Sequence, residues 1–216
     1  QQANRMEDAQ RVLQDIEKPR LKTECLRWLA ALWYRMGVVE RAVEYLEPCA
    51  QDGTQPVCLL ALELAWLYGE MEQWPLAIQH VEVALRHGEQ RVDVLVWAAD
   101  LLAKAGRWSV ASKVLEQALA FKATESVWAW VDERDYGLAM QLWGGAILIG
   151  RGEVLLRLTR LAGVQGNWRR GLEFAQQGLE EMPQHLLLRY LGAEMALAQM
   201  QPSLALQFAD FGSIEP

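Results

Sequence analysis

A short pattern recurs along this chain roughly every 34 residues, and no other feature constrains the fold as strongly. The pattern is a polar or glycine-centred turn followed, a few residues later, by a small residue that serves as a marker. The markers are Ala42, Ala77, Ala111, Gly171 and Ala205. Three of the four steps between them match this period, and the step from Ala111 to Gly171 is nearly twice as long. Such a period is typical of proteins built from stacked copies of one small unit, so we expect a repeat architecture.

The long step between Ala111 and Gly171 contains one more unit. Ala139 divides it into two steps that are both shorter than the period, which predicts a shortened and atypical unit. Ala9 precedes Ala42 by nearly one period, which indicates the second helix of a partial unit. We expect a single domain over residues 1–216, with a partial unit at 1–22, regular units at 23–57, 58–91, 92–125 and 152–185, a shortened unit at 126–151 and a partial or capping unit at 186–216.

Each regular unit carries two apolar stripes with the spacing of an α-helix. In the first unit Leu26, Leu29, Ala30 and Trp33 follow the i, i+3, i+4, i+7 spacing, and Gly37 then breaks the helix. The chain is 52% hydrophobic, which is enough for a substantial core. A lone pair of helices cannot bury both of its apolar faces, so we expect neighbouring pairs to stack around a continuous core.

This pattern resembles the tetratricopeptide repeat, a 34-residue helix-turn-helix with Trp-Leu-Gly-Tyr-type positions in its first helix and Ala-Phe-Ala-Pro-type positions in its second. The resemblance covers nearly the whole chain, although the early Trp position is occupied by Leu26, Ala61, Leu95 or Leu155 and the closing proline is present only at Pro183. It implies an all-α fold, a right-handed α-solenoid of stacked helix-turn-helix repeats. It also implies that the first helices of the units line a concave groove that binds another polypeptide.

Three tryptophans, Trp74, Trp108 and Trp168, stand three residues before their markers. At this position a ring beside the turn can clamp the two helices of its own unit, so we interpret these three rings as structural.

The resemblance also implies which residues face the groove, because the positions of the first helices that are not used in the core become its lining. The rings among them suit binding hot spots, since an aromatic side chain desolvates a large area with few rotors to freeze. Two arginines three residues apart on one helix are expected to attract an acidic segment at the far end of the groove. The predicted groove residues are Arg27, Trp28, Tyr34, Leu62, Trp66, Trp97, Asp100, Arg157, Arg160 and Tyr190.

Charge and motifs exclude several other function classes. A net charge of -7 with a pI near 5.1 argues against a nucleic-acid partner. The longest nearly apolar run, residues 138–149, falls short of the roughly twenty residues that span a bilayer. No GxSxG, HExxH or GxxxxGK[ST] motif occurs, and the cysteines and histidines have no zinc-ligand spacing. We therefore predict no enzymatic activity, no metal and no cofactor.

The leading hypothesis is a protein–protein interaction module, an adaptor, scaffold or chaperone that holds a partner segment in its groove, within a bacterial secretion or envelope-assembly system. Two alternatives stay open: a self-assembling scaffold that forms a homo-oligomer through Trp128, Trp130 and Trp143 of the atypical unit, and a regulatory or sensor domain of a larger protein. The chain begins with Gln and has no basic-then-apolar leader, so we expect a fragment or a processed form. Three cysteines in a chain of this size favour the cytoplasm, with the periplasm as the alternative if the chain is part of a larger envelope protein.

Overall fold

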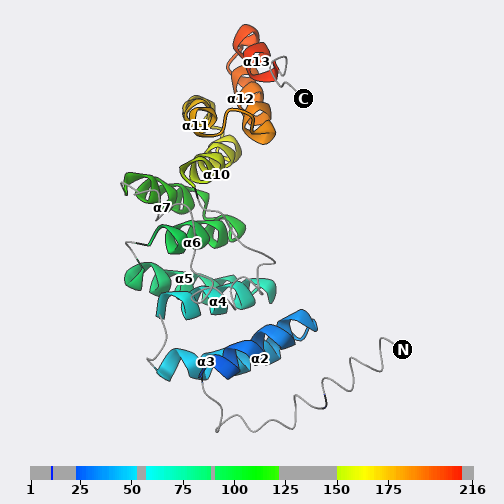
Figure 1. Ribbon diagram of the computed structural model, residues 1–216, viewed down its shortest axis with the longest axis vertical. Helices are drawn as coiled ribbons and strands as arrows, with labels where there is room; N and C mark the ends of the chain where they lie inside the picture. Colours follow the sequence, from blue (N-terminus) through cyan, green and yellow to red (C-terminus); the bar gives the residue numbers. More distant parts are fainter. Residues whose placement is uncertain (1–10, 12–22, 53–56, 89–90, 122–149, 211–216) are drawn as a thin grey trace, which may run out of the picture. The chain divides into compact units, whose positions relative to one another are not determined.

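The computed structural model describes residues 11, 23–52, 57–88, 91–121 and 150–210, and every regular element in these ranges is an α-helix (Figure 1). The described residues divide near residue 90 into two compact units, which we call the N-terminal unit and the C-terminal unit. The predicted partial unit at 1–22, nearly all of the shortened unit at 126–151, Ala139 and the three tryptophans Trp128, Trp130 and Trp143 lie outside the described residues.

The N-terminal unit contains two helix pairs. They are α2 (Thr23–Arg35) with α3 (Val39–Asp52), and α4 (Val57–Glu70) with α5 (Trp74–His87). Within each pair the helices pack on one another, and α3 also packs on α4, so the second pair stacks on the first (Figure 1).

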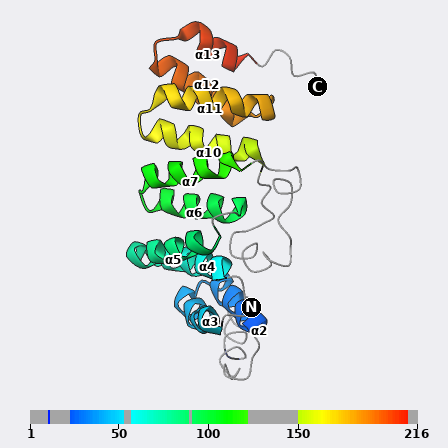
Figure 2. The same cartoon turned by 90° about the vertical axis from the view of Figure 1, so that its left-hand side faces the viewer.

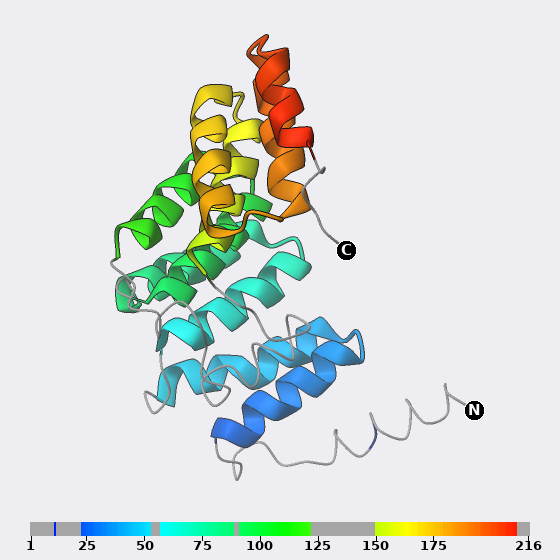
Figure 3. The ribbon, with the colours of Figure 1, turned by 45° about the horizontal axis from the view of Figure 1, so that its top comes forward.

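The C-terminal unit contains three pairs. They are α6 (Val92–Lys104) with α7 (Trp108–Ala120), α10 (Arg151–Val164) with α11 (Trp168–Glu181), and α12 (Leu186–Ala198) with α13 (Pro202–Ala209). Figure 3 shows α12, in orange, and α13, in red, side by side. Helix α10 packs on α7 and α12 packs on α11, so the pairs stack in chain order. We call α2, α4, α6, α10 and α12 the first helices and their partners the second helices.

All five described turns between a first and a second helix share one conformation. In each, the residue five positions before the marker has a positive φ angle. The five residues are Gly37 (78°), Glu72 (59°), Gly106 (73°), Gly166 (70°) and Met200 (58°). The next amide donates a hydrogen bond to the carbonyl oxygen five residues earlier, as from Gln73 N to Tyr68 O at 2.8 Å. This is the Schellman ending of a helix, which satisfies carbonyl groups that the helix itself leaves open.

The markers occupy equivalent places in the structure. Each is the fourth residue of its second helix, and each is buried: Ala42, Ala77, Ala111, Gly171 and Ala205. At Gly171 an added Cβ would collide with the Met195 side chain of α12 and lie 3.2 Å from the Ala162 Cβ of α10. At Gly171 a small residue is therefore required, because α11 lies close to side chains of both α10 and α12.

The predicted tryptophan clamp is present where the structure reveals its contacts. A Cβ added at Gly69 of α4 would lie 3.1 Å from Cζ3 of Trp74, the first residue of α5. Similarly, a Cβ added at Gly163 of α10 would lie 3.9 Å from Cζ3 of Trp168 in α11. Both rings thus lie against the first helix of their own pair, and at Gly69 a larger residue would crowd the Trp74 ring.

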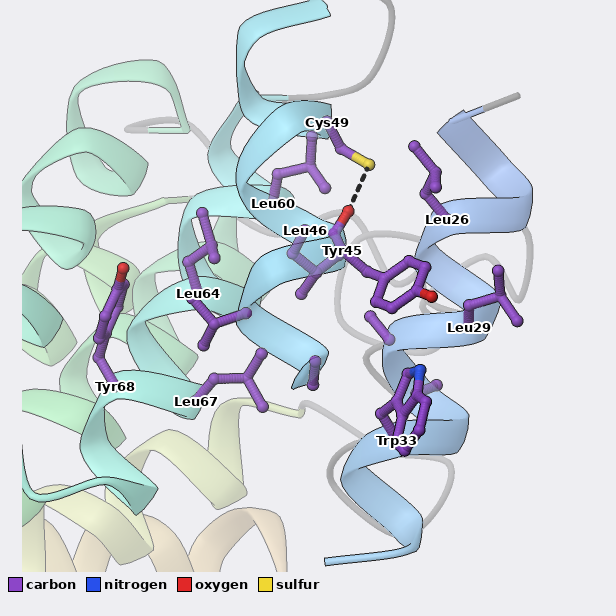
Figure 4. Packing of buried hydrophobic residues seen from close by; sticks show 14 of the residues in the cluster. Leu26, Leu29, Trp33, Tyr45, Leu46, Cys49, Leu60, Leu64, Leu67 and Tyr68 are labelled. Atoms are coloured by element: carbon purple, nitrogen blue, oxygen red, sulfur yellow. Dashed lines mark hydrogen bonds between the residues drawn. The ribbon is translucent and has the colours of Figure 1, made fainter. Parts of the chain in front are cut away.

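The core of the N-terminal unit joins α2, α3 and α4 (Figure 4). Leucines and aromatic residues from the three helices interdigitate, as expected for stacked pairs in which each interface is dry. Its labelled members include Leu26, Leu29, Trp33, Tyr45, Leu46, Leu60, Leu64 and Leu67. In the C-terminal unit a separate cluster joins α11, α12 and α13 around Leu172, Met195 and Phe208.

Candidate polypeptide-binding site

The first helices carry all ten predicted groove residues. In the N-terminal unit, Arg27 of α2 forms an ion pair with Glu63 of α4, through Nε to Oε2 at 3.3 Å and Nη2 to Oε1 at 2.5 Å. Both side chains are buried. Burial raises the pKa of the Glu63 carboxyl, and the Arg27 charge opposes that rise. Arg27 therefore connects two first helices instead of offering a charge to a partner.

The other predicted groove residues of the N-terminal unit differ in accessibility. Trp28 has 53% of its surface exposed, whereas Leu62 is fully buried. Tyr34 and Trp66 are half-buried, and the Trp66 indole Nε1 donates a hydrogen bond to Tyr34 Oη at 3.2 Å. The structure thus brings Tyr34 and Trp66 together, and it leaves Trp28 as the most accessible of the predicted rings on these two helices.

In the C-terminal unit a second ion pair connects first helices. Arg157 of α10 donates from Nε to both carboxylate oxygens of Asp100 of α6, at 3.0 and 3.1 Å, and from Nη1 to Glu153 at 3.2 Å. Burial raises the pKa of Asp100, while Arg157, Arg160 and Lys104 act in the opposite direction. The charge of Arg157 is therefore balanced within the protein, and Trp97, one turn before Asp100, is buried.

Two predicted groove residues remain open to solvent on neighbouring helices. Arg160 of α10 is exposed and forms no hydrogen bond or ion pair within the described part of the chain. Tyr190 of α12, which packs beside α10, has 63% of its surface exposed. Arginine and tyrosine side chains are among those that contribute most at protein interfaces.

A polar cluster that joins α3, α4 and α5 was not predicted from the sequence. Tyr68 Oη donates to Glu47 Oε1 at 2.5 Å, and its ring stacks on His80 with centroids 5.4 Å apart. Burial, together with the nearby Glu47, raises the pKa of Tyr68 to about 12, and burial lowers the pKa of His80. Tyr68 lies on an apolar stripe of its helix, and this periodicity carries no signal for the partners of its hydroxyl group.

The described helices are too short or too polar to cross a lipid bilayer. Within the same residues, no group of three or more His, Cys, Asp or Glu side chains is arranged to hold a metal ion. The predicted groove residues lie on the first helices of each unit, and we consider each set by itself.

Comparison with solved structures defines the class of fold. The chain resembles the C-terminal part of a TPR repeat-containing protein from Cytophaga hutchinsonii, with a TM-score of 0.67, 14% identity, and 96% of this chain and 72% of that chain covered. It also resembles YrrB, described as a TPR protein with an unusual peptide-binding site, with a TM-score of 0.57, 17% identity, and 86% and 81% of the two chains covered. The predicted fold, an all-α solenoid of tetratricopeptide-like repeats, is thus confirmed.

A third similar structure is MamA, from residue 41 to its end, from Desulfovibrio magneticus. Its TM-score is 0.63 at 13% identity, with 87% of this chain and 90% of that chain covered. No protein-family model matches the sequence, and no curated protein is significantly similar to it. At these identities the likeness concerns the fold.

Proposed function

We propose that this protein is a protein–protein interaction module that holds a segment of a partner polypeptide against its first helices. The observation that carries the proposal is that Arg160 and Tyr190 are both exposed and lie on adjacent first helices. Arg157 pairs with Asp100 and Glu153 and so connects α6 with α10. Support also comes from the likeness to YrrB, whose description refers to a peptide-binding site.

The chemistry of this surface favours a segment with an acidic group and an apolar side chain. The Arg160 guanidinium can bind a carboxylate in a bidentate manner. The Tyr190 ring can cover an apolar side chain with little loss of rotamer freedom, because it has only two side-chain torsions. The ion pairs Arg27–Glu63 and Asp100–Arg157 are expected to act as supports, since their charges are already compensated.

A selection experiment tests this function. Short peptides are selected from a random phage-displayed library on the wild-type protein and then measured by calorimetry on variants. We expect Tyr190→Ala and Arg160→Glu each to weaken binding about tenfold, the effect typical of an interface hot spot. Leu206→Ala and Arg86→Glu are matched controls, because both residues are exposed on second helices. Selected peptides that bind all four variants equally would contradict the proposal.

The finer role that we propose is that of an adaptor, scaffold or chaperone in a bacterial secretion or envelope-assembly system. Copurification from the native cell, followed by mass spectrometry, tests it, with the Tyr190→Ala variant as the control. A partner from such a system that is lost in the variant supports the role. Partners that are all unrelated to secretion or to the envelope would refute it.

A further inference from the structure

The turns of the C-terminal unit form a surface that the proposed function does not use. The turns that follow α6, α10 and α12 lie along the same side of this unit (Figure 2). Side-chain hydrogen bonds connect them: Gln165 Nε2 donates to Ser112 Oγ at 2.9 Å, and Gln199 Nε2 donates to Trp168 O at 3.2 Å. We call this surface the turn edge.

Exposed apolar groups follow the turn edge. Trp108 and Trp168 open the second helices α7 and α11 and are partly exposed, and Val164 ends α10 with much of its surface exposed. Met200, in the last turn, is 88% exposed, and Leu197 beside it is also exposed. Large apolar groups gathered on one exposed surface are typical of an interaction site.

The stretches that contain these turns carry only basic charges, and Glu116 and Glu173 directly follow two of them. Asp and Glu are absent from residues 101–115, 154–172 and 195–209, which are the stretches that contain the three turns. Lys104, Arg107, Lys113, Arg169 and Arg170 lie in or near these turns. Arg107 is exposed and forms no hydrogen bond or ion pair within the described residues. The Arg169 side chain is 88% exposed, and its partner, Glu173, lies 3.5 Å away on the same helix.

At the other ends of the same helices, three arginines all have acidic or carbonyl partners from within the unit. Arg91 pairs with Asp93 at 2.9 Å and Arg151 with Glu181 at 3.4 Å. Arg189 donates to Pro183 O and Asp210 O, each at 3.0 Å. Arg170 pairs with Glu116 at 3.5 Å and with Glu173 at 3.6 Å, so the charges of this edge that have no acidic partner among the described residues are those of Arg107 and Lys113. They belong to a chain whose net charge is -7.

We propose that the turn edge is a second binding surface, which takes an acidic polypeptide segment carrying aromatic or leucine side chains. Carboxylates of the segment pair with Arg107 and Arg169, and its apolar side chains cover Trp108, Trp168 and Met200. An anionic membrane fits less well, because attraction to it takes clusters of about four to eight basic residues and the acidic remainder of the chain is repelled. A nucleic acid is disfavoured for the same electrostatic reason.

Fluorescence anisotropy with a defined probe tests this proposal. The probe is a labelled peptide of three Asp-Leu-Glu-Phe repeats, and peptides of three Lys-Leu-Lys-Phe or three Asp-Ser-Glu-Ser repeats serve as comparisons. We expect only the first peptide to bind well, with an affinity that falls as salt is added, because exposed charge pairs are screened over about 10 Å at 0.1 M salt. Equal binding of the basic peptide would overturn the proposal.

Matched charge reversals locate the surface. Arg107→Glu combined with Arg169→Glu should weaken binding of the acidic peptide about tenfold or more. Arg41→Glu combined with Arg86→Glu changes the net charge equally on exposed second-helix positions of the N-terminal unit, and it should change binding by less than about twofold. Equal losses in both double variants would show that only net charge matters and would overturn the assignment.

Further variants separate this surface from the first-helix site and from other partners. Met200→Glu should also weaken binding of the acidic peptide. Because Met200 is exposed, this substitution is not expected to disturb folding. Peptides selected on the wild-type protein that lose affinity for Tyr190→Ala should bind the Arg107→Glu/Arg169→Glu variant as tightly as wild type, so the two surfaces can fail independently. Tighter binding of phosphatidylserine vesicles or single-stranded DNA than of the peptide would refute an acidic polypeptide as the partner. A doubling of the protein's mass in solution at low salt, abolished by the Arg107→Glu/Arg169→Glu variant, would also refute the proposal. The partner would then be a second copy of this chain.

Discussion

At the scale of single residues, the Arg27–Glu63 pair shows how a predicted binding residue became a structural one. The guanidinium and the carboxylate are both buried, and each compensates the charge of the other, which would be costly to bury alone. The cost of removing one partner should therefore exceed the net contribution of the pair. This asymmetry is measurable.

We expect Arg27→Met to lower the free energy of unfolding by about 3 kcal/mol near pH 8, because it leaves the Glu63 carboxylate buried and unpaired. Arg27→Met with Glu63→Leu should be less destabilised than Arg27→Met alone, because no charge remains buried. Urea unfolding, followed by circular dichroism, measures both. A double variant that is less stable than the single variant would contradict this account.

The same single variant should be sensitive to pH. The pKa of Glu63 is already raised by burial, and loss of Arg27 removes the charge that opposes this rise. Burial raises the pKa of such a carboxyl in the folded protein above its pKa in the unfolded protein. Between these two pKa values the folded protein binds more protons than the unfolded protein, so the free energy of unfolding falls as the pH rises. The deficit of Arg27→Met relative to wild type should therefore be smaller at pH 5 than at pH 8. Arg27→Met with Glu63→Gln, the control, should show no such difference.

At the scale of elements, the five turns adopt one conformation with three glycines and two other residues. A non-glycine residue with positive φ carries a steric cost of roughly 1–2 kcal/mol, partly offset because glycine loses more entropy on folding. Glu72→Gly and Met200→Gly should thus each raise the free energy of unfolding by about 0.5–1 kcal/mol. Gly106→Ala should lower it by about 1 kcal/mol, since Gly106 has a φ of 73°. Urea midpoints of the three variants decide this, and destabilisation by both glycine substitutions would refute it.

Close helix contacts make a second prediction at this scale. A Cβ added at Gly192 of α12 would lie 2.5 Å from Cδ1 of Phe208 in α13, and a ring has little freedom to move away. Gly192→Ala should cost about 2 kcal/mol in thermal or urea unfolding, the usual range for overpacking. Phe208→Leu in the same protein should restore part of the loss. The control is Gly152→Ala, whose added Cβ would lie nearest to Cγ, Cε and Sδ of the flexible Met182 side chain.

At the scale of the whole molecule, stacked pairs contact their neighbours in the chain, so disturbances should remain local. Gly192→Ala is expected to increase amide hydrogen exchange in α12, α13 and the adjoining α11. It should leave α6 and α7 unchanged, because stability in such arrays is shared mainly between adjacent units. Hydrogen-exchange mass spectrometry measures each helix separately. A uniform loss of protection across both units would instead indicate one cooperative structure.

The sequence by itself determined the helix pairs and their spacing. Helical periodicity and turn-forming glycines are local properties, and the described first helices begin at residues 23, 57, 92, 151 and 186, each within one residue of a predicted unit start. The markers were readable for the same reason, because close helix crossing requires a small residue at a fixed place in each unit. That all these units form a single domain stays a prediction.

Only the tertiary structure decided which predicted groove residues are accessible. Trp28 and Trp97 look alike in the sequence pattern, yet Trp28 is exposed and Trp97 is buried. Arg157 and Arg160 lie on one helix, yet only Arg157 meets an aspartate from another helix. The accessibility and the ion pairing of a side chain depend on which side chain of a neighbouring helix pair lies opposite it. The two ion pairs between first helices join residues that are 36 and 57 positions apart in the sequence. Periodicity within one helix contains no information about such contacts.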